Sequence, residues 1–210
     1  MFAALAVFVF VLGQTPGPEG PAFVDNCAPC SISVSPSGPV YDAHFLVVKS
    51  PEGRLVRRIA LVRDNKQSQE LTVAEMAPVA EGEKFMFGGM DINFDGYRDL
   101  MLVVARGAAN ATAQYWVYAP DSQTFKDIGT HPVFTVDPDK KRLKTYERGG
   151  SGGMIFNAKE FEFQSGQLVL MREESQRPTR NPNAFQHTIR ERRKGAMITV
   201  KQETIAPPRQ

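Results

Sequence analysis

The stretch that decides the fold reads Asp91-Ile-Asn-Phe-Asp-Gly-Tyr-Arg-Asp-Leu-Met-Leu-Val-Val104, an acidic loop followed at once by an apolar run. Oxygen-bearing side chains recur along the loop, at its residues Asp91, Asn93, Asp95 and Asp99. Gly96 stands where such a loop must turn sharply, and the next residue, Tyr97, offers its backbone carbonyl. Hard cations such as calcium take about six to eight oxygen ligands. The stretch therefore predicts a Ca²⁺-binding loop that leads directly into a strand.

The loop does not follow the EF-hand pattern. An EF-hand places a bidentate Glu at its last position, where this chain has Leu102, and it lies between two helices. Here two glycines precede the loop, and the apolar run 100–104 has the length of a strand. The loop instead resembles that of integrin-type FG-GAP blades, D-x-[DN]-x-D-G-x-x-D-L, through Leu100. A second interpretation is an Asp-Gly turn between strands with solvated acids.

Length and composition favour one exported domain. The chain has 210 residues, 42% of them apolar, and a formal net charge of +2, which gives no reason to expect a nucleic-acid partner. Residues 1–15 contain a short apolar run and read as a signal peptide. If that segment is an uncleaved anchor, it attaches the protein to a membrane. Residues 16–40 read as a Pro/Gly/Ser-rich linker and residues 41–205 as the folded domain.

The two cysteines, Cys27 and Cys30, form a C-x-x-C pattern within the linker. A redox motif of the thioredoxin type would need a helix after the first cysteine, and residues 31–39 are rich in Ser and Pro. Zinc would need two further ligands nearby, and the chain has no other cysteine. A local disulfide in an oxidising compartment is the interpretation we favour.

Short apolar or alternating segments alternate with turn signals over the whole domain, and helical periodicity is almost absent. Only residues 71–80 are undecided between a short helix and a loop. The sequence predicts an all-β, antiparallel fold of about ten short strands, either a sandwich or a propeller-like array, with one calcium loop. The main expected strands cover residues 44–49, 55–62, 100–104, 114–118, 125–128, 134–136, 142–146, 160–164, 167–172, 187–192 and 196–202.

A glycine-rich stretch at 149–153 matches the G-x-S-x-G pattern of a nucleophile elbow. That elbow needs a helix directly after it, whereas strand alternation follows here. His187 falls in an expected strand, and the sequence suggests no acidic partner for it. We therefore expect no enzymatic activity. The aromatic residues Tyr115, Trp116 and Tyr118 are expected to be packing residues.

The same region has the form Y-x-x-G-x-x-G on a loop between two expected strands. Its glycines, Gly149 and Gly152, allow the loop to protrude into a concave partner. Arg148 and Ser151 are hydrogen-bond donors that suit the carboxylates of a carbohydrate-cleaving groove, and Tyr146 begins the motif. A second interpretation is a loop that only connects two strands.

Taken in order, the acidic loop, the aromatic strand 115–118, the Y-x-x-G-x-x-G loop and the strand at 166–170 resemble a known family. They are similar to the calcium-binding, lysozyme-inhibitor-like immunity proteins of the bacterial cell envelope. That resemblance implies a periplasmic or envelope location and a β-fold related to propellers and to periplasmic lysozyme inhibitors. It also implies that Tyr146, Gly149 and Gly152 belong to an inhibitory loop.

These observations together predict an exported calcium-binding protein that binds and inhibits a lysozyme-like, peptidoglycan-cleaving enzyme. The alternative is an FG-GAP-like binding or adhesion module of the envelope, in which calcium is purely structural. Several copies of the acidic loop would favour that alternative, and this chain has one.

Overall fold

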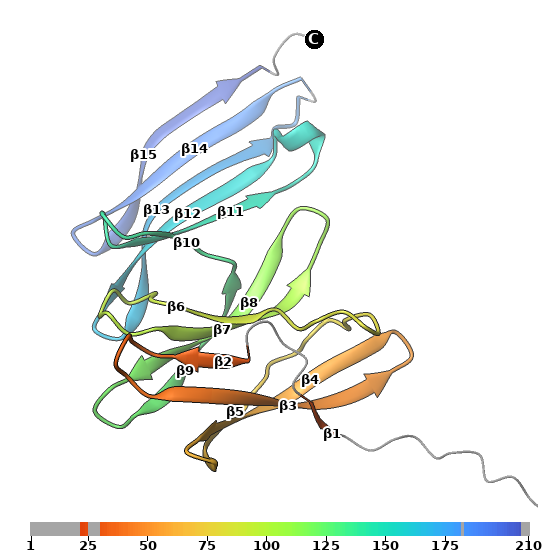
Figure 1. Ribbon diagram of the computed structural model, residues 1–210. Helices are drawn as coiled ribbons and strands as arrows, with labels where there is room; N and C mark the ends of the chain where they lie inside the picture. Colours follow the sequence, from red (N-terminus) through yellow and green to blue (C-terminus); the bar gives the residue numbers. More distant parts are fainter. Residues whose placement is uncertain (1–21, 25–29, 182, 207–210) are drawn as a thin grey trace, which may run out of the picture.

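The fold is all-β and antiparallel, as the sequence predicts. The computed structural model describes residues 22–24, 30–181 and 183–206, with side chains from residue 30 onward. In this part of the chain every regular element is a strand, apart from one short 3-10 turn. The strands form three open sheets that are stacked one beyond the other (Figure 1).

The first sheet has the order β1-β3-β4-β5, and β2 also pairs with β3. Its strands are β1 (Ala22–Val24), β2 (Ser31–Ser33), β3 (Val40–Ser50), β4 (Gly53–Arg63) and β5 (Lys66–Thr72). The long β3–β4 hairpin turns at residues 51–52, where the sequence predicts a turn.

The second sheet has the order β6-β7-β8-β9. Its strands are β6 (Phe87–Met90), β7 (Asp99–Arg106), β8 (Ala111–Ala119) and β9 (Thr124–Pro132). The acidic loop joins β6 to β7, so the apolar run after the loop is a strand, as expected. β7 carries a bulge at Val104, because Val103 pairs with Ala113 and Ala105 pairs with Thr112.

The third sheet has the order β10-β11-β12-β13-β14-β15 and contains only sequential neighbours. Its strands are β10 (Thr135–Asp137), β11 (Arg142–Arg148), β12 (Phe156–Gln164), β13 (Gln167–Pro178), β14 (Phe185–Arg193) and β15 (Ala196–Ile205). The 3-10 turn η1 (Ser151–Gly153) lies between β11 and β12. β10 and β15 are the two edges of this sheet.

The second sheet is the middle layer, because both of its faces are buried. Leu100, Leu102 and Trp116 pack against the first sheet in one core. Val103 and Tyr115 belong to a second core that includes residues of the third sheet. Alternate residues of β7 thus face opposite cores, and its sequence is therefore a continuous apolar run.

The second core joins the middle sheet to the third. Phe134 and Leu143 are buried there, and the ring of Phe134 lies 4.9 Å from that of Tyr115. The backbone N–H of Phe134 donates to the Tyr115 hydroxyl at 3.0 Å. The three aromatic residues at 115, 116 and 118 are all buried, which confirms that they are packing residues.

Residues 73–86 contain no helix and cross the end of the first sheet in an extended path. Val79 forms an isolated bridge with Arg54, and the N–H of Ala77 donates to the carbonyl of Val104 at 2.7 Å. The guanidinium of Arg54 lies 5.2 Å from the ring centroid of Phe85 and donates to the Ala80 carbonyl at 3.4 Å. In the undecided region 71–80, residues 71–72 thus end β5, and the remaining residues form a loop that contacts both the first and the middle sheet.

The fold includes residues that the sequence analysis assigns to the linker. β2 pairs with β3, and both Ile32 and Val34 are buried in the first core. The expected signal peptide lies outside the described residues, as does most of the expected linker. No helix in the described chain is long and apolar enough to span a membrane.

Candidate functional site

The acidic loop is organised around the carboxylate of Asp91. Its Oδ1 accepts from the N–H of Phe94 at 2.6 Å and from that of Asp95 at 3.3 Å, and its Oδ2 accepts from Gly96 at 2.9 Å. Gly96 has φ +89°, which glycine adopts without strain. The carboxylate of Asp91 therefore holds the following backbone in a tight turn around it.

The exposed tip of the loop holds two more of the predicted ligands. Asn93 Nδ2 donates to Asp95 Oδ2 at 2.8 Å, and Asp95 Oδ1 accepts from the N–H of Tyr97 at 2.8 Å. The ring of Tyr97 lies 5.6 Å from that of Tyr118 and packs against the first core. The tip is thus fixed on one side by its own hydrogen bonds and on the other by an aromatic contact.

Asp99 is fully buried and connects the loop to β8. Its Oδ2 accepts from the N–H of Ile92 and its Oδ1 from the N–H of Tyr118, each at 2.8 Å. Burial raises the pKa of this carboxyl to about 7. The two backbone hydrogen bonds act against that rise, and the negative charges of Asp95 and Asp91 add to it.

The donor set of the loop fits a hard cation in its chemistry and its order. Asp91, Asn93, Asp95 and Asp99 supply only oxygen ligands, and Tyr97 adds a carbonyl. Asp91 and Asp95 lie close enough to Asp99 for their charges to affect its pKa. In the described chain, however, no three or more Asp, Glu, His or Cys side chains are grouped as a metal site. Calcium binding therefore stays a prediction.

The glycine-rich loop is attached to the middle sheet at Arg148. Asn110, in the β7–β8 hairpin, accepts from the Arg148 N–H at 2.8 Å and donates from Nδ2 to the Arg148 carbonyl at 2.9 Å. Gly149 then approaches Ile155 closely, and its N–H donates to the Ile155 carbonyl at 2.7 Å. A Cβ on Gly149 would lie 2.5 Å from Cγ2 of Ile155, so only glycine fits.

The tip of this loop is a compact reversal. Ser151, Gly152 and Gly153 all have positive φ values, of 57°, 65° and 91°. The N–H groups of Gly153 and Ile155 donate to the carbonyl of Gly150 at 3.3 and 3.4 Å. Ser151 is exposed at this tip.

Tyr146 presents its side chain beside the loop. It is 53% exposed, and its ring is stacked on that of Phe156 with centroids 5.6 Å apart. Behind Phe156, at 6.4 Å, lies the ring of His187. Tyr146, Arg148 and Ser151 therefore lie along one short, well-held segment, which brings the predicted recognition residues together.

His187 has acidic partners that the sequence did not suggest. Its Nε2 lies 2.9 Å from Oε1 of Glu174, and its Nδ1 lies 3.1 Å from Oε1 of Glu203. The three residues come from neighbouring strands, so only the strand register reveals the group. Within the described chain, no hydrogen bond joins the Ser151 hydroxyl to a histidine.

The structure does not bring the two loops together. The acidic loop precedes β7, whereas Asn110, which holds Arg148, follows that strand. A strand rises about 3.3 Å per residue, so β7 separates them by about 25 Å. The acidic loop therefore does not contribute side chains to the glycine-rich loop.

The structure describes one of the two cysteines of the predicted disulfide. Cys27 lies outside the described residues, so its pairing with Cys30 stays a prediction. The carbonyl of Cys30 accepts from the N–H of Ala43 at 2.9 Å, and its side chain packs against the first core. Cys30, the second cysteine of the pattern, is thus attached to the start of the folded region.

Comparison with known proteins bears on the fold. No protein-family model matches the chain, and no curated protein matches it. Among solved structures, it is similar to a Xanthomonas type IV secretion system related protein, with a TM-score of 0.54 and 16% sequence identity. That match covers 86% of this chain and 98% of the other. At this identity the likeness concerns the fold alone.

A protein from Lactobacillus plantarum also matches, with 12% identity over 85% of this chain and 60% of its own. Its TM-score is 0.26, and this likeness carries no structural conclusion.

Proposed function

We propose that this chain is an exported, calcium-stabilised protein of the cell envelope that binds and inhibits a lysozyme-like, peptidoglycan-cleaving enzyme. The observation that carries the proposal is the preorganised loop Tyr146–Gly153, with an exposed tip and a base fixed by Asn110. A loop that is already ordered loses little conformational entropy on binding. The similarity of its fold to a Xanthomonas type IV secretion system related protein is consistent with a role in the cell envelope.

The loop offers hydrogen-bond donors of several kinds to a groove that contains catalytic carboxylates. The guanidinium of Arg148 pairs with a carboxylate in a charge-assisted, two-point contact. The hydroxyl of Ser151 supplies a further donor at the exposed tip. Tyr146 adds an aromatic surface, held in place by Phe156, for contact with the apolar part of the groove. This chain itself supplies no catalytic step in the proposal.

The proposed role of calcium is structural. Asp91, Asn93, Asp95, Asp99 and the carbonyl of Tyr97 would hold the ion at the start of β7. A bound cation there offsets the repulsion among three neighbouring carboxylates. The ion therefore holds the start of β7 in place. At about 3.3 Å per strand residue, this point lies about 25 Å from the recognition loop.

A panel of purified muramidases, mixed with the full-length protein, tests the inhibition. We expect slower clearing of a peptidoglycan suspension by at least one enzyme and a complex with it on a sizing column. Arg148→Ala should weaken both effects, whereas Arg180→Ala, at an exposed arginine in the β13–β14 loop, should leave them unchanged. Full hydrolysis in every mixture, with no complex formed, would overturn the proposal.

Experiments with the same purified protein distinguish inhibition from the other candidate functions. Binding restricted to surface glycans or matrix proteins would support an FG-GAP-like adhesion module instead. Hydrolytic activity of the protein alone that disappears in Ser151→Ala would show an enzyme. We expect equal and negligible rates for the wild type and for Ser151→Ala.

A further inference from the structure

The middle sheet has an open edge at β6. This strand pairs with β7, and within the described chain no second strand pairs with it. The carbonyl of Met86 accepts from the Val103 N–H at 2.9 Å, so Met86 faces β7. Backbone groups alternate in direction along a strand. The N–H and C=O of Gly89 therefore point to the side of β6 opposite β7. Among the described residues these groups of Gly89 have no partner, so the edge presents backbone groups of the kind that accept an additional strand.

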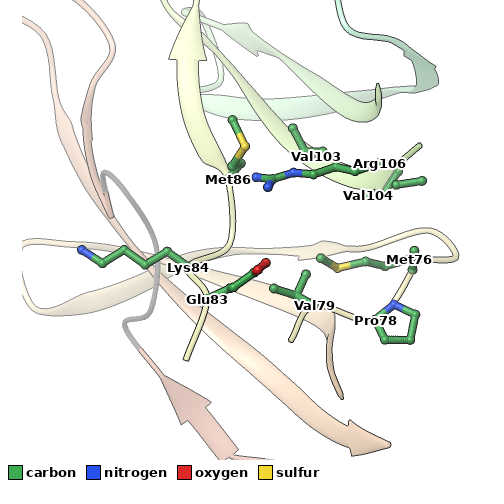
Figure 2. A pocket seen from close by; sticks show the side chains of 11 residues that line it. Met76, Pro78, Val79, Glu83, Lys84, Met86, Val103, Val104 and Arg106 are labelled. Carbon is green, nitrogen blue, oxygen red and sulfur yellow. The ribbon is translucent and has the colours of Figure 1, made fainter. Parts of the chain in front are cut away.

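Two pockets lie on either side of Met86, which is 50% exposed. The first has a volume of about 150 Å³, and Figure 2 shows Met86 and Arg106 on one side of it and Pro78 and Val79 on the other. The second, of about 270 Å³, lies over Gly88 and Gly89. The bulge in β7 lies at the first pocket, where the Val104 carbonyl accepts from the Ala77 N–H.

Packing within the described fold requires glycine at only one of the two glycine positions of β6. A Cβ on Gly89 would lie 3.2 Å from Cγ2 of Ile32, so packing explains this glycine. A Cβ on Gly88 would have nothing within 4 Å, so packing within the described fold does not require glycine there. The missing side chain leaves the second pocket open and lets another backbone come close.

The charged residues around the pockets are mostly cationic. Lys84, Arg98 and Arg106 are exposed, and none of them forms an ion pair with another described residue. Glu83 is the one acidic side chain that lines either pocket. Figure 2 shows Arg106 reaching across the first pocket beside Met86, while Lys84 points away from it. This edge therefore suits a ligand that carries negative charge.

We propose that the edge of β6 binds an extended, acidic segment of a partner protein. The segment adds a strand beside β6 through backbone hydrogen bonds to Gly89. Its apolar side chains enter the pockets on either side of Met86, and its carboxylates meet Arg98 and Arg106. This surface is separate from the glycine-rich loop. The proposal therefore does not depend on whether the protein inhibits a peptidoglycan-cleaving enzyme.

Short fluorescent peptides test the proposal with the full-length protein. One has the sequence Asp-Leu-Thr-Val-Thr-Leu-Asp, and its control replaces both terminal Asp residues with Lys. Fluorescence anisotropy should show that the acidic peptide binds at least about tenfold more tightly. Amide hydrogen exchange should slow at Gly89 when the peptide is bound. Equal affinity for the two peptides, or unchanged exchange at Gly89, would overturn the proposal.

Variants locate the binding surface. Gly88→Val fills open space, so it should keep the melting temperature and weaken binding of the acidic peptide by about tenfold or more. Met86→Lys should weaken it as well, whereas Ile198→Lys, at an exposed apolar residue of β15, should have no effect. An equal loss in Ile198→Lys would contradict the proposal. So would slow exchange at Gly89 in the dilute free protein, since the edge would then already be covered.

Discussion

Asn110 and Arg148 are joined by two hydrogen bonds although they are 38 residues apart. Asn110 lies in the β7–β8 turn of the middle sheet, and Arg148 ends β11 of the third sheet. The side-chain amide of Asn110 both accepts from and donates to the backbone of Arg148, as a neighbouring strand would. The base of the exposed loop is therefore tied to the middle sheet at a defined point.

Removing this connection should loosen the loop without unfolding the protein. We expect Asn110→Ala to lower the NMR order parameters of residues 149–153 from about 0.85 toward 0.6 or below. Each hydrogen bond contributes about 0.5–1.5 kcal/mol, which is enough to change the loop population. Asn110→Asp keeps the acceptor for the Arg148 N–H and should give an intermediate effect. Order parameters that do not change in either variant would contradict this role.

Gly149 and Gly150 are neighbours with opposite tolerance for a side chain. A Cβ on Gly149 would meet Cγ2 and Cβ of Ile155, whereas one on Gly150 meets nothing within 4 Å. Gly149→Ala should therefore lower the free energy of unfolding by about 1–3 kcal/mol. Gly150→Ala, its matched control, should change it by less than about 0.5 kcal/mol. Urea denaturation measures both, and equal values would show that Ile155 moves aside freely.

Calcium should stabilise the folded state. An ion that binds only the folded protein adds about 2.7 kcal/mol at 100 times its dissociation constant, which appears as a higher melting temperature. Asp95→Ala should remove most of this increase, whereas Asp64→Ala, in the exposed β4–β5 turn, should retain it. A melting temperature that does not respond to calcium, after verified removal of metal, would rule out the site.

Asp99 supports the fold through the backbone whether or not an ion binds. Asp99→Leu would leave the buried N–H groups of Ile92 and Tyr118 without acceptors. Each buried unsatisfied donor costs about 1–3 kcal/mol, so we expect a loss of roughly 2–6 kcal/mol in unfolding free energy. Asp99→Asn keeps one acceptor oxygen and should lose less. Urea denaturation in the presence of a chelator provides the measurement.

The third sheet should respond to acid through Glu174. Hydrogen bonds from Arg172 and then from His187 hold the pKa of this carboxyl below its ordinary value of 4.5. The folded protein therefore binds fewer protons at this site than the unfolded chain, so stability from Glu174 is present above pH 4.5 and is lost as the pH falls below it. Glu174→Gln should flatten the fall in melting temperature below that pH. Glu52→Gln, in an exposed turn, should keep the wild-type slope.

The sequence predicts those parts of the structure that depend on near neighbours. The spacing from Asp91 to Asp99 identifies the loop, and the apolar run 100–104 identifies a buried strand. The glycines near Ser151 identify an irregular, exposed reversal. In each case the information lies within about ten residues of chain, which is the range of turn chemistry and side-chain alternation.

Contacts between distant residues could not be predicted in this way. Asn110 gives no local signal of its bonds to Arg148, and the acidic partners of His187 follow from strand register. The described chain has fifteen strands where about ten were expected. β13, for example, continues past Arg172 because its backbone pairs with β14 as far as Pro178, which lies opposite Phe185. The short β2 is hidden because its buried Ile32 stands among serines and prolines.

The two-sided burial of β7 also determines how the parts of the molecule depend on one another. Loss of the first sheet would expose Leu100 and Leu102 to water, and loss of the third would expose Val103 and Tyr115. Each exposed apolar side chain costs about 1.5–3 kcal/mol. Neither outer sheet can therefore unfold without weakening the middle one. In thermodynamic terms the three sheets form one cooperative unit, in which β7 transmits the loss of either core to the other.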